Sequence, residues 1–128
     1  MATRHQARKT VVSLLYSFDY VQNSEHVNDY LEEHKIRNAI REWALELFNG
    51  VQANLLKIDE CLKGILESNE VSNLGGMEKA ILRLGVYELL FTKTDKAVVI
   101  NEAIELAKEY ASDNAPKLIN GVLDKVRN

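Results

Sequence analysis

Apolar residues recur at helical spacing along almost the whole chain, and the strict alternation typical of half-buried strands is almost absent. In the first segment the apolar positions fall on one face of a helix of about four or five turns. This stripe consists of Ala7, Val11, Leu14, Leu15 and Phe18. The first segment is therefore predicted to be an amphipathic helix with one buried face.

The same periodicity predicts helices further along the chain. A short helix should follow Ser24, a good N-cap, and one long helical stretch should run from Ile36 to Glu67, with Gly50 and Gly64 as points of breakage or bending. After a loop at residues 72–76, helices are predicted over residues 77–90, 100–111 and from Pro116, which suits a first turn. The inward positions expected in these three helices are Met77, Ala80, Ile81, Leu84, Tyr87 and Leu90; Ile100, Ile104, Ala107 and Tyr110 or Ala111; and Ile119, Val122, Leu123 and Val126.

Composition supports an all-helical protein. One proline and six glycines among 128 residues leave little room for turns, which favours long helices joined by short loops. The hydrophobic content of 46% is enough for a core of its own. The fold class is therefore predicted as all-α, with six or seven helices in one bundle and residues 1–128 as a single domain.

Neither a membrane segment nor an oxidising compartment is indicated. Ser13, Ser17 and Asp19 interrupt the apolar positions of the first segment, so it does not resemble a signal peptide. No apolar stretch approaches the length that spans a membrane. The single cysteine, Cys61, excludes an internal disulfide and lies in an apolar-periodic helix, which indicates a buried structural thiol in a reducing cytoplasm.

Catalytic and metal sites are poorly supported. The chain has no phosphate-binding loop, dinucleotide fingerprint or nucleophile elbow. Glu102, Glu105 and Glu109 share a helix face, for which a solvated surface is favoured over acid–base chemistry. His26 and His34 lack the spacing of a zinc-binding motif, and a surface pair is favoured. We therefore expect no enzyme, no metal and no cofactor.

A basic cluster at the start of the chain contrasts with the formal net charge of −3. No carboxylate side chain precedes Asp19, and on a helix Arg4 and Arg8 are i, i+4 neighbours, as are His5 and Lys9. Like charges at this spacing cost a few tenths of a kcal/mol, and the helix N-terminus adds positive charge. With no acidic side chain nearby in sequence, the cluster predicts a surface for an anion, with a frayed, solvated end as the alternative.

Two further features extend this basic surface. Tyr16 should lie beside the basic side of the first helix, where an aromatic ring next to cations can grip single-stranded nucleic acid or a partner protein. A half-buried position at the edge of the core is the alternative for Tyr16. Lys79 and Arg83 form a second like-charged i, i+4 pair, again without a compensating acid at that spacing. If the two helices pack together, the two clusters would form one continuous groove.

Three segments together carry a resemblance over essentially the whole chain: ARKTVVSLLYSF, MEKAILRLGVYELLF and VINEAIELAKEYASDNAPKLINGVLDKV. In this order they resemble the NusB family of bacterial transcription antitermination factors. The resemblance implies about seven helices in two subbundles. It also implies binding of boxA single-stranded RNA together with the ribosomal protein NusE, in a complex with other Nus factors and RNA polymerase that makes transcription of ribosomal RNA operons processive.

The resemblance also implies roles for individual residues. RNA contacts fall on Arg4, His5, Arg8 and Lys9 of the first helix, on Lys79 and Arg83, and on Lys117 and Asn120 near the end of the chain. Contacts with the partner protein fall on Tyr16 and Glu78. Leu118 stands where the family often has phenylalanine, and Gly121 is expected to allow close helix packing.

Two alternatives stay open at this point. The chain could be a helical protein–protein interaction or homodimerisation module whose basic end docks on an acidic partner, without specific RNA binding. It could also be an enzyme-associated domain, since RNA cytosine methyltransferases carry a related domain. The second alternative is the weaker one, because no methyltransferase sequence accompanies the 128 residues.

Overall fold

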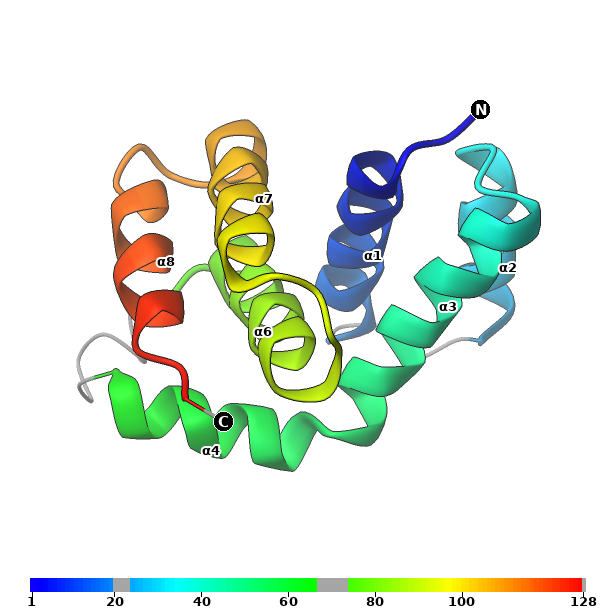
Figure 1. The fold of residues 1–128 in the computed structure, drawn as a ribbon. Helices are drawn as coiled ribbons and strands as arrows, with labels where there is room; N and C mark the ends of the chain where they lie inside the picture. Colours follow the sequence, from blue (N-terminus) through cyan, green and yellow to red (C-terminus); the bar gives the residue numbers. More distant parts are fainter. Residues whose placement is uncertain (20–23, 67–73, 128) are drawn as a thin grey trace.

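The computed structural model describes residues 1–19, 24–66 and 74–127, and these residues form helices and no strand (Figure 1). The all-α prediction is therefore confirmed. The helices are α1 (Arg4–Phe18), α2 (Ser24–Glu33), α3 (Asn38–Ala53), α4 (Leu55–Ile65), α6 (Gly76–Phe91), α7 (Lys96–Tyr110) and α8 (Ala115–Asp124).

Helix α6 is the centre of the arrangement, because it packs against α1, α3, α4, α7 and α8. Helices α2 and α3 both pack on α1, whereas α7 and α8 pack on each other and on α6. Two groups of helices thus share α6, and Figure 1 shows α6 and α7 between α1 on one side and α8 on the other.

Most predicted core positions are buried. The stripe of α1 from Ala7 to Leu15 is buried, and so are all four inward positions predicted for the closing helix. Helix α7 is rotated relative to the prediction, since Val99, Ala103, Leu106 and Ala107 are buried, whereas Ile104 is only half-buried. Helix α7 packs against both α6 and α8, and the two alanines present the small side chains that close packing on two sides requires.

The prediction of one long helix from Ile36 to Glu67 is wrong, because the described part of this stretch is divided into α3 and α4. Glu67 itself lies outside the described residues. The break is at Asn54, whose side-chain amide donates to the carbonyl of Gly50 at 2.8 Å. The backbone of Asn54, at φ −119° and ψ 19°, leaves the helical region. Neither Gly50 nor Gly64 is the point of breakage. A Cβ at Gly50 would overlap the ring of Tyr87, so this glycine allows α3 to approach α6 closely.

The loop predicted at residues 72–76 is described only from Leu74, because residues 72–73 lie outside the described part of the chain. Gly76 already belongs to α6. Pro116 occupies the first turn of α8, as predicted.

The expectation that Gly121 allows close packing is wrong, because a Cβ at this position would meet no atom within 4 Å. Close packing is found instead at Gly85 of α6, where a Cβ would lie 2.9 Å from both terminal methyl carbons of Leu123 in α8. Gly121 is on the exposed side of α8, whereas Gly85 is on the buried side of α6.

The described residues also bear on two of the expected absences. They include no helix that combines the length and apolar character required to cross a bilayer. Nor do they bring three histidine, cysteine or carboxylate side chains together as a metal site would need.

The Cys61 thiol is half-buried, and desolvation raises its pKa, which disfavours the reactive thiolate.

Candidate nucleic-acid interface

The amino end of α1 is fixed by a capping box. The Thr3 hydroxyl accepts a hydrogen bond from the backbone N–H of Gln6 at 3.1 Å, and the Gln6 side-chain oxygen accepts one from the backbone N–H of Thr3 at 2.8 Å. Both partners are neutral, and the first turn contains no acidic residue. The positive end of the helix dipole is thus left without a local carboxylate.

Arg8 is not on the surface, which corrects the sequence-based expectation. Its guanidinium donates two hydrogen bonds to Glu88 of α6, at 2.9 and 2.8 Å, and lies 3.5 Å from a carboxylate oxygen of Glu102 of α7. The side chains of Arg8 and Glu88 are only 3% and 2% exposed. The acidic partners come from helices about 80 to 94 residues away in sequence, and helix packing brings them to α1.

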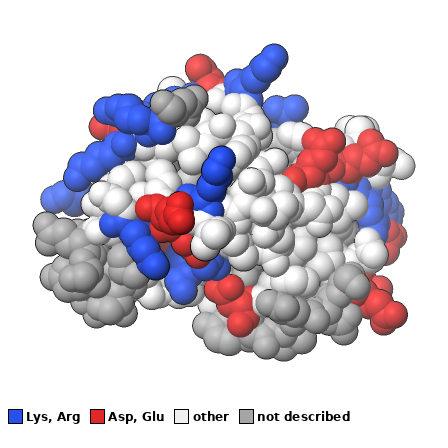
Figure 2. All heavy atoms as spheres, turned by 90° about the horizontal axis from the view of Figure 1, so that it is seen from below, with Lys and Arg blue, Asp and Glu red and all other residues white. Residues whose placement is uncertain are grey.

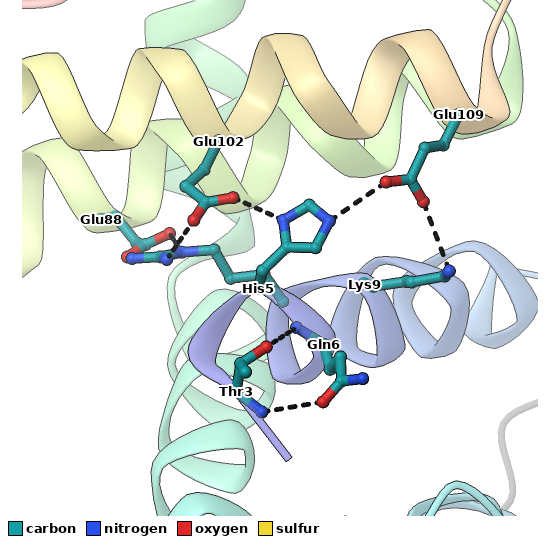
Figure 3. A network of polar contacts seen from close by, with 8 residues as sticks. Thr3, His5, Gln6, Lys9, Glu88, Glu102 and Glu109 are labelled. Atoms are coloured by element: carbon teal, nitrogen blue, oxygen red, sulfur yellow. Dashed lines mark hydrogen bonds and ion pairs between the residues drawn. The ribbon is translucent and has the colours of Figure 1, made fainter.

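His5 and Lys9 are paired with carboxylates of α7 as well. Figure 3 shows the His5 ring between Glu102 and Glu109, with its two nitrogens 2.6 and 3.1 Å from the respective carboxylate oxygens. The Lys9 ammonium lies 3.3 Å from Glu109. The prediction of a solvated carboxylate face is therefore wrong for Glu102, whereas Glu109 is exposed, as predicted, although it is paired with His5 and Lys9. The prediction also holds for Glu105, which lies largely exposed beside Lys108.

The geometry around His5 favours the imidazolium form, since both ring nitrogens can donate to carboxylates only when both are protonated. The hydrogen bond with Glu102 is the main cause that raises the pKa of His5 above 6.5, and Glu109 adds to it. The hydrogen bond from His5 in turn lowers the pKa of Glu109 below 4.5. His5 thus ties the start of α1 to α7 as a cation.

We expect this tie to depend on pH. Because the folded-state pKa of His5 is raised, its contribution to stability is fully present below about pH 6.5 and is lost as the pH rises through the folded-state pKa. The contribution of Glu109 is present above about pH 4.5 and is lost as the pH falls through its lowered pKa. His5→Gln should therefore cost about 0.2–1 kcal/mol of unfolding free energy between these limits, and less at about pH 9, in urea titrations.

The matched control is His5→Gln in a background that carries Glu102→Gln and Glu109→Gln. In that background the pH dependence of the difference should disappear, since no carboxylate faces the ring. A cost of His5→Gln that is the same at about pH 6 and about pH 9 would contradict the proposed charge state.

Arg4 and Lys9 carry the most accessible positive charges of α1. The Arg4 side chain is exposed, and its guanidinium lies 4.6 Å from the centre of the Trp43 ring, which the guanidinium of Arg8 also contacts at 5.0 Å. The Lys9 side chain is 44% exposed, and its ammonium lies 5.3 Å from the centre of the Tyr110 ring. Both cations therefore stand next to an aromatic surface.

The second basic pair is only partly available. Arg83 donates two hydrogen bonds to Asp59 of α4, each at 3.0 Å, and its Nη1 contacts both carboxylate oxygens of Asp19 after α1, at 3.1 and 3.3 Å. No acid compensates the pair at i, i+4 spacing, as predicted, but carboxylates from elsewhere in the chain neutralise Arg83, and Lys79 is half-buried. Because Arg8 and Arg83 both point at carboxylates, these residues do not form the continuous basic groove expected between α1 and α6.

Tyr16 and Glu78 lie where a partner could reach them. The Tyr16 side chain is 38% exposed on α1, which places it at the edge of the core and not within it. Glu78, in the first turn of α6, accepts a hydrogen bond from the Ser112 hydroxyl at 3.1 Å. Both positions remain predictions as partner contacts.

The predicted positions near the end of the chain lie on another side of the molecule. Lys117, Asn120 and Gly121 are exposed on α8. Lys117 and Gly121, together with Leu118 and with Ile65 of α4, border a hollow of about 140 Å³, and Asn120 does not line it. Figure 2 shows lysine and arginine side chains concentrated on the part of the lower face where α8 and the carboxyl end of α4 lie, whereas acidic side chains gather on the opposite part. Exposed cations there are Lys63 near the carboxyl end of α4, Lys117 in α8, and Lys125 and Arg127 directly after α8.

Comparison with known proteins identifies relatives over nearly the full length. A sequence profile of the NusB family matches residues 5–128. The chain is 58% identical over 125 residues to the transcription antitermination protein NusB of Campylobacter jejuni, covering 97% of this chain and 95% of that protein. It is 54% identical over 128 residues to the protein of the same name in Nitratiruptor sp., covering 98% and 92%.

Solved structures agree with the sequence relatives. NusB of T. maritima has a TM-score of 0.84 at 33% identity and covers 97% of this chain and 89% of its own. A crystal structure of antitermination factors NusB and NusE in complex with double-stranded RNA also gives a TM-score of 0.84 at 33% identity, covering 94% and 92%. The same fold is thus found in a protein crystallised with a second protein and with RNA.

Proposed function

The chain belongs to the NusB family, and on this premise we propose that it is a transcription antitermination factor that binds boxA single-stranded RNA together with the ribosomal protein NusE. The observation that carries the proposal is the match of family, fold and length to relatives that include a NusB–NusE–RNA complex. We propose residues 1–128 as one RNA-binding domain that works in the cytoplasm with other Nus factors and RNA polymerase. Its effect is processive transcription of ribosomal RNA operons.

The accessible cations of α1 are the proposed phosphate contacts. Arg4 and Lys9 are exposed enough to meet a phosphate directly, and His5 adds a cation between them. Arg8 supports binding from within, because its buried ion pair fixes the helix that carries these side chains. An arriving phosphate competes with Glu109 for Lys9 and His5, which discourages binding of unselected polyanions.

The remaining residues form outer parts of the proposed surface. Lys79 and Arg83 on α6, and Lys117 and Asn120 on α8, extend RNA contacts beyond α1. Arg83 acts mainly by holding α6 in position and not by direct contact with a phosphate, since its guanidinium is already paired with Asp19 and Asp59. Tyr16 and Glu78 face NusE. A homodimer that covers α1 is the alternative use of this surface, and it would compete with RNA.

The test is fluorescence anisotropy of a labelled boxA RNA, with and without NusE, over a salt series. We expect tighter binding with NusE and a preference for boxA over a scrambled strand. The double variant Arg4→Ala, Lys9→Ala should flatten the plot of log K against log salt by about 1.4, because each phosphate contact with a single strand contributes about 0.7. Lys57→Ala, an exposed lysine of α4, is the matched control and should leave the slope unchanged.

Equal affinity for boxA and scrambled RNA, with and without NusE, would overturn the proposal. If the protein then sedimented as a dimer whose formation Arg4→Ala, Lys9→Ala weakens, the homodimerisation alternative would be supported instead.

A further inference from the structure

A cavity of about 360 Å³ lies where the amino end of α1 meets the carboxyl ends of α2 and α7. Figure 1 shows these three ends together at the same end of the molecule. The cavity is bordered by Gln6, Lys9 and Ser13 of α1, by Tyr30, His34 and Lys35 at the end of α2, and by Tyr110 of α7. We call it the α1–α2 pocket. Its volume is in the range of small-molecule sites and exceeds that of one nucleobase.

The pocket contains an aromatic surface that is already held in place. The rings of Tyr30 and His34 stack at 4.2 Å with an interplanar angle of 26°. The Nδ1 atom of His34 donates a hydrogen bond to the Tyr30 carbonyl at 2.9 Å, which fixes the imidazole plane. His34 is nevertheless exposed, so one more ring can extend the stack from the solvent side. Tyr110 supplies a third aromatic ring.

The charge of the pocket favours an anionic ligand. Lys9 and Lys35 border it, and no aspartate or glutamate is among the described residues that line it, although the Lys9 ammonium also contacts Glu109 outside the pocket at 3.3 Å. Lys35 has a left-handed backbone with φ 57° at the end of α2. The backbone N–H of Ile36 donates to the carbonyl of Leu31 and that of Lys35 to Glu32, which is the Schellman pattern. Glycine would adopt this conformation without steric cost, yet here the position carries a cation.

We propose that the α1–α2 pocket receives one unpaired base of single-stranded RNA, which stacks on the Tyr30–His34 pair while its phosphate meets Lys9 and Lys35. Unstacked bases held on aromatic rings beside cations are the usual basis of single-strand recognition. The proposal deepens the proposed function and rests on it, since Lys9 belongs both to this pocket and to the phosphate contacts of α1. It adds α2, and the residues Tyr30, His34 and Lys35, to the path of the RNA.

The test compares RNA affinity among three variants of the full chain in the presence of NusE. His34→Ala should weaken binding of boxA RNA by between about 5- and 150-fold, the range for loss of one stacked base. His34→Phe keeps a ring at this position and should restore most of the affinity. His26→Ala is the matched control, because the His26 ring also neighbours that of Tyr30, with ring centres 5.7 Å apart, but His26 is not among the residues that line the pocket.

A second measurement detects direct contact between the RNA and the pocket by photocrosslinking. RNA that carries a photoreactive uridine at each position in turn should crosslink to the peptide with His34 at one or two adjacent positions only. Uridine monophosphate is the probe for a free nucleotide: saturable shifts of pocket signals in nuclear magnetic resonance, lost in His34→Ala, would support a base site that also accepts a mononucleotide. If uridine monophosphate causes no such shifts but His34→Ala still weakens binding of boxA RNA, the pocket accepts a base only as part of an RNA strand.

Equal RNA affinity of His34→Ala, His26→Ala and the unchanged protein would overturn the pocket proposal while leaving RNA binding itself intact. Loss of affinity in His34→Ala without recovery in His34→Phe would also overturn it, since a ring at position 34 would then not be sufficient. Failure of the unchanged protein to prefer boxA, by contrast, overturns the proposed function and not only this part of it.

Discussion

Replacing Glu88 with alanine is expected to lower the free energy of unfolding by about 3–5 kcal/mol, the cost of removing one partner of a buried ion pair. Glu88 is 2% exposed and accepts two hydrogen bonds from the guanidinium of Arg8. Without this carboxylate Arg8 would keep the longer contact with Glu102 and the contact with the Trp43 ring, and it would remain a buried cation. Urea unfolding followed by circular dichroism measures the loss.

The control is the double variant Arg8→Met, Glu88→Leu. Replacing both members of a buried ion pair by apolar side chains of similar volume is often neutral or stabilising, so most of the loss should be recovered. A loss below about 1 kcal/mol for Glu88→Ala would mean that the pair is not buried as described.

The ion pair changes how α1 should be tested for RNA binding. From the sequence alone, Arg8→Glu is an obvious charge reversal that should spare the helix. The structure places position 8 beside Glu88 and Glu102, where a third carboxylate would be buried next to two others. Arg8→Glu is therefore expected to unfold the protein, so loss of RNA binding in this variant would not report on a phosphate contact. Arg4 and Lys9 are the informative positions.

The burial of Arg8 could have been predicted in part from the sequence. Arg8 shares a helix face with Val12 and Leu15, both buried, and Glu88 lies on a face with Ile81 and Leu84. An acid and a base that each interrupt an apolar stripe need a partner, and each is the obvious partner of the other. Periodicity could not show that α1 and α6 pack so that these positions meet, since this depends on the relative register of two helices.

Other parts of the fold also separate into features that local periodicity predicts and features that it cannot predict. The stripe of α1 and the inward face of the closing helix follow from local periodicity, and both are confirmed. The end of α3 at Asn54 does not follow from it, because apolar spacing continues from Val51 through Leu55 to Ile58. The side chain of Asn54 ends the helix by bonding to the Gly50 carbonyl, a local competition that hydrophobic periodicity does not detect. The α1–α2 pocket likewise needs three helix ends that only tertiary packing brings together.

Gly85→Val is expected to lower the free energy of unfolding by about 1–3 kcal/mol, the usual cost of overpacking a core. A Cβ at Gly85 would lie 2.9 Å from both terminal methyl carbons of Leu123, and valine adds two further methyl groups. Leu123 is fully buried, so it cannot move aside without displacing α8 from α6. Thermal or urea unfolding monitored by circular dichroism gives the difference from the unchanged protein.

Gly121→Val makes the same substitution on the exposed side of α8, where a Cβ meets no atom within 4 Å, and should change stability by no more than about 0.5 kcal/mol. A loss at Gly121 as large as that at Gly85 would contradict the helix packing described above. If Gly121→Val leaves stability unchanged but weakens binding of RNA or NusE, glycine at this position serves an approaching ligand. The neighbouring Lys117 and Leu118 would then belong to the same contact surface, since all three border the hollow between α8 and α4.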